Sequence, residues 1–194
     1  MVAVPSTMLA LGTPVPAFAL PDAVSGARVS PAQYAGAPAL LVMFICNHCP
    51  YVQHIMPELG RLERDFGPRG LAMVAINSND VDAFPDDAPA AMARLARDRG
   101  WRFPFLFDGS QEVARAFQAA CTPDFYLFDA GRRLVYRGQL DDSRPKSDVP
   151  VTGRDLRQAI EATLAARAVP DGQRPSVGCN IKWKPGNAPA WFGQ

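Results

Sequence analysis

The feature that most constrains the fold is an apolar run, Leu40 to Ile45, that leads directly into the segment Cys46-Asn47-His48-Cys49. The run has no alternation of polar and apolar residues, which is typical of a central parallel strand covered on both faces. Pro50 follows the second cysteine and suits the first turn of a helix, which we predict over residues 50–66. A strand that delivers two cysteines to the start of a helix is an arrangement suited to redox chemistry.

The start of a helix favours a charged sulfur. Its unpaired backbone N–H groups and the positive end of its dipole stabilise a thiolate over a thiol, and the thiolate is the nucleophile in disulfide exchange. A cysteine in water titrates at about 8.5, whereas helix N-termini and nearby cations bring that pKa to about 3.5–7.5. We therefore expect the sulfur of Cys46 to be charged and accessible, with a protonated His48 as a nearby cation.

Composition narrows the class of protein. A chain of 194 residues suits one domain, and an apolar fraction of 48% excludes a disordered chain. The 20 Lys and Arg residues nearly balance the 19 Asp and Glu residues, so nucleic acid and anionic membrane surfaces are not expected as main partners. No apolar stretch is long enough to span a bilayer.

The cysteines and the N-terminus bear on location. Four cysteines in a chain of this length do not make a disulfide scaffold, and they fit a reducing compartment with one working dithiol. The apolar stretch from Met8 to Leu20 follows no Lys or Arg and is interrupted by Gly12, Pro14 and Pro16, unlike a signal peptide. We predict a cytoplasmic protein.

Strand and helix patterns alternate along most of the chain. We predict strands over residues 17–20, 40–45, 71–76, 103–107, 124–128 and 134–137, and helices over 50–66, 89–99, 113–119 and about 153–166. This order predicts an α/β sheet with helices on both faces, ending in an antiparallel hairpin and a helix. Thr152 and Asp155 resemble a capping box for that last helix.

The remaining segments are predicted to be connections and ends within one domain, residues 1–194. Residues 77–87 are read as a solvated acidic loop, and residues 1–16 as an N-terminal arm. Residues 167–194 form a tail that carries Trp183, Trp191 and Phe192, and three large aromatic residues favour packing along the body.

The other cysteines leave alternatives open. Structural zinc usually takes four ligands as two paired sets, whereas Cys121, Cys179, His48 and His54 stand singly, so no metal site is predicted. Cys121 suits a small buried hydrophobic residue, or an additional redox thiol. Cys179 could fold back and form a second disulfide, but the sequence does not determine that distance.

Three segments carry a resemblance to a known family. Residues 12–20, Phe44 to Pro50 and Thr122-Pro123 resemble the opening stretch, the active-site segment and the cis-proline position of the thioredoxin superfamily. More closely, residues 12–165 resemble the branch of redoxin (alkyl hydroperoxide reductase/thiol-specific antioxidant) domains and TlpA-like thiol–disulfide oxidoreductases. Residues 178–183 resemble the tail of an uncharacterised thioredoxin-like subgroup. The resemblance implies a thioredoxin-like fold with a central mixed sheet.

The resemblance also implies an activity and residue roles. Cys46 would attack a protein or small-molecule disulfide, and Cys49 would resolve the mixed disulfide. His48 and Asn47 would tune the thiolate, Pro123 would face the disulfide, and the backbone of Thr122 would pair with a substrate strand. A reducing partner would restore the dithiol, and no cofactor is implied.

Departures from the family pattern keep two other functions open. Ile45 stands where thioredoxins have Trp, and residues 40–45 lack the buried carboxylate that assists the second cysteine. A thiol peroxidase would use Cys49, with Cys46 in place of the usual threonine and no evident arginine near Thr122-Pro123. A copper- or zinc-handling module similar to the Sco proteins would need a wider cysteine spacing and a distant histidine. The oligomeric state is left open.

Overall fold

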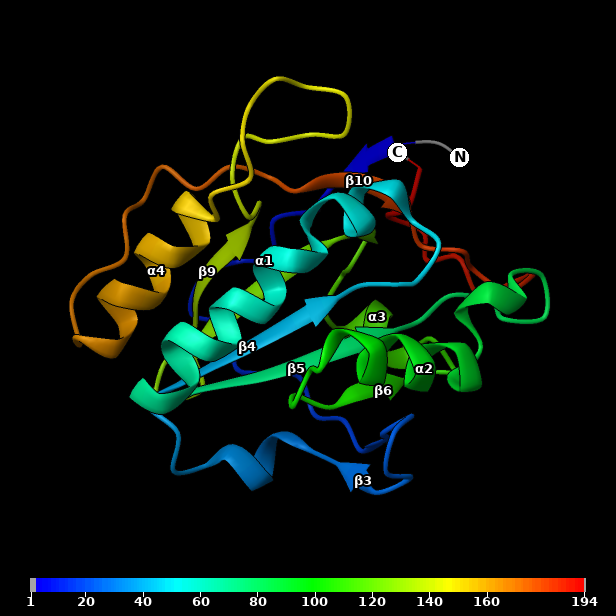
Figure 1. Cartoon of the computed structure of the whole chain (residues 1–194), viewed down its shortest axis with the longest axis horizontal. Helices are drawn as coiled ribbons and strands as arrows, with labels where there is room; N and C mark the ends of the chain where they lie inside the picture. The colour runs from blue at the N-terminus through cyan, green and yellow to red at the C-terminus, as the bar shows by residue number, and fades with distance from the viewer. Residues whose placement is uncertain (1–2, 194) are drawn as a thin grey trace.

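The computed structural model describes residues 3–193, and a five-stranded mixed sheet lies at its centre (Figure 1). The strands follow the order β6-β5-β4-β8-β9. Their bounds are β4 Ala39–Phe44, β5 Leu71–Asn77, β6 Phe105–Phe107, β8 Asp124–Phe128 and β9 Leu134–Gly138. The pairs β4–β5 and β5–β6 are parallel, whereas β4–β8 and β8–β9 are antiparallel. The predicted mixed sheet with a terminal hairpin is confirmed.

Helices cover both faces of this sheet, as predicted. The bounds are α1 Pro50–Phe66, α2 Pro89–Arg99, α3 Glu112–Ala116 and α4 Arg154–Leu164. Leu41 and Met43 of β4 pack in one buried cluster with residues of α1, α2 and α4, whereas Val42 and Phe44 pack with Phe117 on the other face. Successive strand residues point to opposite faces, so a strand covered on both sides must be apolar throughout. This explains why all six residues of β4 are buried.

The last helix begins differently from the prediction. Its N-cap is Gly153, in the left-handed region with φ 66°, and Thr152 forms no capping box. The carboxylate of Asp141 instead accepts the backbone N–H groups of Thr152 and Gly153, at 2.7 and 2.6 Å. A Cβ at position 153 would lie 2.8 Å from Oε1 of Glu58 on α1, so glycine allows α4 to approach α1 closely. Within residues 3–193, no helix combines the length and apolar character needed to cross a bilayer.

Two smaller sheets lie outside the central one, and one of them includes strands from the predicted arm and tail. The predicted strand over residues 17–20 is reduced to β2, Leu20–Pro21, which pairs with β3, Arg28–Val29. In the third sheet, β10 (Val177–Asn180) lies between β1 (Ala3–Pro5) and β7 (Cys121–Thr122), antiparallel to both. Strands of two to four residues are too short to show an alternation pattern.

Beyond β10, Trp183 makes edge contacts with Trp191 and Phe192, with ring centroids 6.2 and 5.9 Å apart. Trp183 also packs against the cluster that contains Phe44 and Phe117. The tail thus carries β10 to the part of the sheet where the two cysteines lie.

Candidate active site

The two cysteines of the Cys46–Cys49 segment lie between β4 and α1. Cys46 follows the end of β4, and Cys49 is the N-cap residue of α1. Because Phe44 pairs with Asp124 in the β4–β8 ladder, residues just after Phe44 meet residues just before Asp124. The sulfur of Cys46 lies 3.4 Å from Oγ1 of Thr122, and the sulfur of Cys49 lies 3.2 Å from the Thr122 carbonyl oxygen. The Thr122–Pro123 peptide bond is cis.

The cysteine whose pKa is lowered is Cys49, not Cys46 as predicted. Hydrogen bonds from the thiols of Cys179 and Cys46 lower the pKa of Cys49 well below its usual value, and the backbone N–H of Val52 contributes in the same direction. The pKa of Cys46 is raised by its hydrogen bond to Cys49, by burial and by the charge of Asp87. The main physical reason is that two thiols, Cys179 and Cys46, donate to the Cys49 sulfur, and the start of α1 at Pro50 adds a smaller effect in the same direction.

The accessibility predicted for Cys46 is also wrong. The exposed fraction is 1% for Cys46 and 0% for Cys49. Both cysteines belong to the buried cluster that also includes Val52 of α1 and Cys179 of β10. An external disulfide therefore reaches the sulfurs only when the surrounding loop or the strand β10 moves.

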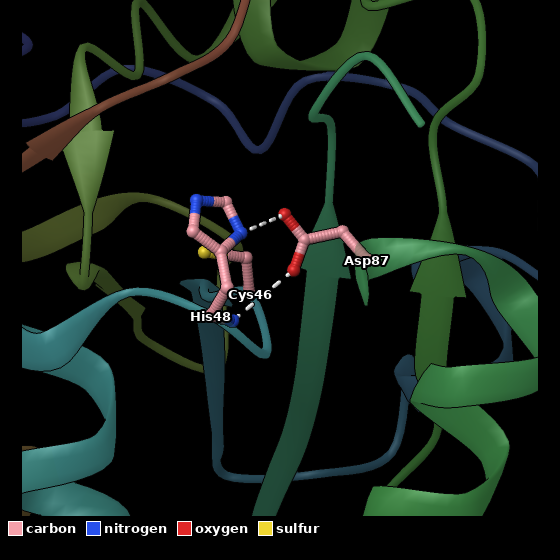
Figure 2. A group of neighbouring side chains, drawn as sticks. All are labelled: Cys46, His48 and Asp87. Carbon is pink, nitrogen blue, oxygen red and sulfur yellow. Dashed lines mark hydrogen bonds and ion pairs between the residues drawn. The ribbon is translucent and has the colours of Figure 1, made fainter. Parts of the chain in front are cut away.

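A buried carboxylate organises the loop between the cysteines (Figure 2). Asp87 is completely buried in a short 3₁₀ helix, Pro85–Asp87, that follows β5. Its Oδ2 lies 2.6 Å from Nδ1 of His48 and accepts a hydrogen bond from the Asn79 side chain at 2.7 Å. Its Oδ1 accepts the backbone N–H groups of Asn47 and His48, at 2.8 and 3.3 Å.

The His48–Asp87 contact favours the charged form of both side chains. The hydrogen bond to Asp87 raises the pKa of His48 above its usual value, although burial acts against it. Burial raises the pKa of Asp87, but the hydrogen bonds from His48, Asn79 and Asn47 outweigh that effect and leave the pKa lowered. The buried Asp87 carboxylate therefore favours a protonated imidazole beside the cysteines.

Aromatic and cationic side chains complete the surroundings of His48. The imidazole stacks on Phe84, with centroids 5.4 Å apart and planes inclined by 7°. The ammonium of Lys182 lies 5.7 Å from the centre of the Phe84 ring and donates to both oxygens of Asn180. Its charge lowers the pKa of His48 slightly, against the larger effect of Asp87.

Sequence reasoning missed Asp87. The acidic loop that contains it was predicted to be solvated, whereas Asp80 and Asp87 are 8% and 0% exposed. A usable signal was present, because the loop follows the carboxyl end of β5 and such ends line ligand sites in α/β sheets.

Cys46, His48 and Asp87 each offer a donor atom within 4.8 Å of the others, as a metal site would require. They supply three donors, one fewer than structural zinc takes. Both oxygens of Asp87 already accept N–H groups. A cation bound here would have to displace the proton between His48 and Asp87.

The predicted substrate contact at Thr122 is not available. Thr122 of β7 pairs with Cys179 of β10, so the chain's own tail occupies the strand edge that was expected to receive a substrate. The structure thus brings Cys179 to the site and leaves Cys121 beside it. The buried Cys121 thiol donates to the carbonyl oxygen of Pro123 at 3.7 Å.

Comparison with known proteins identifies the family. The Redoxin family model matches residues 10–156. The chain belongs to the Redoxin family. A comparison with curated proteins gave no match. Among solved structures, two uncharacterised proteins share this Redoxin architecture over nearly their whole length. They are a conserved protein from Geobacillus kaustophilus (51% identity, 95% of this chain and 98% of that chain, TM-score 0.93) and the hypothetical protein SMc02350 from Sinorhizobium meliloti 1021 (48% identity, 94% and 99%, TM-score 0.92).

More distant structures show the wider fold of this Redoxin chain. A thiol:disulfide interchange protein of the thioredoxin family from Chlorobium tepidum TLS is 20% identical, with a TM-score of 0.62 over 80% of this chain and 98% of that chain. The fold is therefore thioredoxin-like, as the resemblance implied.

Proposed function

We propose that this Redoxin-family chain is a thiol–disulfide oxidoreductase whose redox couple is Cys46 and Cys49. One observation carries the proposal: the thiol of Cys46 hydrogen-bonds the sulfur of Cys49 at the first turn of α1. Two sulfurs in contact, one of them negative, are the starting point of dithiol–disulfide exchange.

Cys46 is the better placed of the two sulfurs to meet a substrate. The Cys49 sulfur is surrounded by the thiols of Cys46 and Cys179, the Thr122 carbonyl and the N–H of Val52. Cys46 instead contacts Cys49 and the Thr122 hydroxyl. Transfer of one proton along the Cys46–Cys49 hydrogen bond moves the negative charge to Cys46, where a protonated His48 stands nearby.

The reaction then proceeds in two balanced steps. The Cys46 thiolate attacks one sulfur of the substrate disulfide, forms a mixed disulfide and releases the other sulfur as a thiolate. The Cys49 thiolate, after losing its proton, attacks the Cys46 sulfur and releases the remaining substrate thiolate. The substrate gains two electrons and two protons, and the protein keeps a Cys46–Cys49 disulfide. A dithiol reductant returns it to the starting state, and the reducing cytoplasm is the location we propose.

Turnover of insulin disulfides with dithiothreitol as reductant tests this function. The wild-type chain should accelerate insulin reduction, and Cys46→Ser and Cys49→Ser should both fall to the uncatalysed rate. Cys121→Ser is the matched control and should keep the wild-type rate, because Cys121 contacts Pro123 and not the couple. A wild-type rate equal to the uncatalysed rate would reject the proposal.

The charge on Cys49 favours a second candidate, the reduction of peroxides. The lowered pKa of Cys49 at the start of α1 is what a peroxidatic thiol requires. Arg144 lines a small hollow with Pro123, but its guanidinium donates to the carbonyls of Asp141 and Ser143 and to the Gln139 side chain. Peroxide consumption that needs Cys49 and survives Cys46→Ser would support this activity.

A further inference from the structure

Cys179 brings a third thiol to the proposed redox couple. It lies in β10 directly opposite Thr122, whose carbonyl oxygen is 3.2 Å from the Cys49 sulfur. The thiol of Cys179 hydrogen-bonds that same sulfur. Cys49 therefore contacts two thiols, one from its own loop and one from a strand 130 residues further along the chain.

A glycine determines how closely β10 approaches. At Gly178, a Cβ would lie 2.0 Å from the carbonyl oxygen of Thr122, so only glycine lets the strand lie against β7 at this register. Both ends of β10 are anchored as well. After the strand, the carbonyl oxygen of Lys182 accepts hydrogen bonds from the backbone N–H of Asp80 and the side-chain amide of Gln111, each at 2.8 Å. Before the strand, the Ser176 hydroxyl donates to the carbonyl oxygen of Gly138 at 2.7 Å. Cys179 is thus held at a fixed position beside Cys49.

From this arrangement we propose that Cys49 has two alternative disulfide partners, Cys46 and Cys179, and that Cys179 is a second resolving thiol. The inference rests on the proposed function, because it begins from the Cys46–Cys49 disulfide. The Cys179 thiolate attacks the Cys49 sulfur, a Cys49–Cys179 bond forms, and the Cys46–Cys49 bond breaks. Cys46 leaves as a thiolate and takes up the proton that Cys179 lost. No electrons enter or leave the protein.

The charges around Cys179 change in the direction that this step needs. In the reduced protein, the hydrogen bond to Cys49 is the main cause that raises the pKa of Cys179. When Cys49 is part of a disulfide, it carries no negative charge and that cause disappears. Burial still raises the pKa of Cys179, and the charge of Lys182 still lowers it. Oxidation of Cys49 therefore removes the largest cause that disfavours the Cys179 thiolate, the nucleophilic form.

The consequence is a covalent link between α1 and the tail. A Cys49–Cys179 disulfide ties the N-cap residue of α1 to β10, the strand that occupies the edge of β7. The link returns Cys46 to the thiol form and holds β10 in place over the couple. Cys121 is a nearby thiol that should not form this link. It lies on the neighbouring strand β7, opposite Asn180, and donates to the carbonyl oxygen of Pro123.

Tryptic mapping of the full chain distinguishes the two disulfides. Cys46 and Cys49 share the peptide 29–61, whereas Cys179 lies in 168–182 and Cys121 in 116–132. Reduced protein is oxidised with diamide, which couples neighbouring thiols, and remaining thiols are blocked with N-ethylmaleimide. Wild type should give both an internal disulfide in 29–61 and a cross-link of 29–61 to 168–182. Most Cys46→Ser molecules should carry the cross-link, and Cys179→Ser should carry only the internal disulfide.

The possible outcomes distinguish failure of the Cys179 proposal from failure of the proposed oxidoreductase function. If Cys46→Ser shows no cross-link to 168–182 while wild type forms the internal disulfide, Cys179 is not a resolving thiol. A link from 29–61 to 116–132 in its place would overturn the assignment too. If wild type forms neither disulfide and does not reduce insulin, both the proposed function and the inference fail.

Discussion

Nδ1 of His48 lies 2.6 Å from Oδ2 of Asp87, and the same carboxylate binds the backbone N–H groups of Asn47 and His48. One buried carboxylate therefore holds the loop between the two cysteines and raises the pKa of the His48 imidazole. The pair is the part of the site whose physical consequences are most direct to measure.

Replacing Asp87 by Asn should lower the pKa of His48. The amide has no negative charge to stabilise the imidazolium, and burial then favours the neutral ring, so the pKa should fall to about 6.5 or below. The measurement is a titration of the imidazole resonances by NMR. The chain has 2 histidines, so a His54→Gln variant assigns the signals. An unchanged pKa of His48 would show that Asp87 does not hold its proton.

The contribution of this pair to stability should depend on pH in both directions. The pKa of Asp87 is lowered, so its contribution is lost as pH falls below about 4, through the folded-state pKa. The pKa of His48 is raised, so its contribution is lost as pH rises above about 6.5, through its folded-state pKa. The loss of unfolding free energy in Asp87→Asn, measured by urea denaturation, should therefore be largest between these values. A loss that is independent of pH would contradict the ion pair.

Neutralising His48 should make the Cys46–Cys49 couple less oxidising. A cation beside the couple stabilises the thiolate form, so His48→Gln should shift the reduction potential to a more negative value, by roughly 30 mV for each unit that the thiolate pKa rises. His54→Gln is the matched control on α1 and should leave the potential unchanged. A positive shift in His48→Gln would require a different role for the imidazole.

The buried Asp124 should give the folding stability a second pH dependence, separate from that of the His48–Asp87 pair. Burial raises its pKa to about 8, although hydrogen bonds from Tyr126 and from the N–H of Phe125 act against that effect. A raised carboxyl pKa gives stability that is complete below about pH 4 and is lost as pH rises towards the folded-state value.

Asp124→Asn carries no such titration. The stability of Asp124→Asn relative to wild type should therefore rise steadily between pH 5 and pH 8. The difference in unfolding free energy should grow by up to roughly 1.4 kcal/mol per pH unit, and it is followed as the difference in melting temperature. The exposed Asp148 gives the control, Asp148→Asn, which should show no trend. A constant difference between Asp124→Asn and wild type would mean that Asp124 is ionised throughout.

Gly178→Ala should loosen β10. The new Cβ would lie 2.0 Å from the carbonyl oxygen of Thr122, so the strand must move, at a cost of about 1–3 kcal/mol. Hydrogen exchange should show that the β10 amides exchange faster than in wild type. In a separate measurement, an alkylating reagent should modify Cys46 faster. At Gly172 a Cβ would meet nothing within 4 Å, so Gly172→Ala is the control. Unchanged protection of β10 would show that its pairing with β7 does not need glycine.

Much of the fold could be predicted from local pattern. The apolar run before Cys46 and the helix signals at Pro50 and Gly100 mark segments whose structure depends on nearby residues, and α1 and α2 have the predicted bounds. The two cysteines were predicted to lie at the start of a helix for the same reason.

The rest of the site depends on contacts between distant segments. Asp87 contacts the loop between the two cysteines although it lies 40 residues from Asn47 in the sequence. Its own segment has the composition of a solvated turn. The position of Cys179 depends on a four-residue strand that pairs with β1 and with β7. The lowered pKa falls on Cys49 and not on Cys46 because Cys179 and Cys46 both hydrogen-bond the Cys49 sulfur, and the contact with Cys179 joins segments 130 residues apart in the sequence.

The most direct test of the central claim is the disulfide state of peptide 29–61 in the full-length Cys179→Ser variant, which leaves Cys46 as the partner of Cys49, as the chain equilibrates with glutathione at increasing oxidised fractions. The account predicts one two-electron transition in which Cys46 and Cys49 lose their thiols together and Cys121 keeps its own. Two thiols that persist at every ratio, or glutathione adducts on Cys46 and Cys49 with no bond between them, would contradict it.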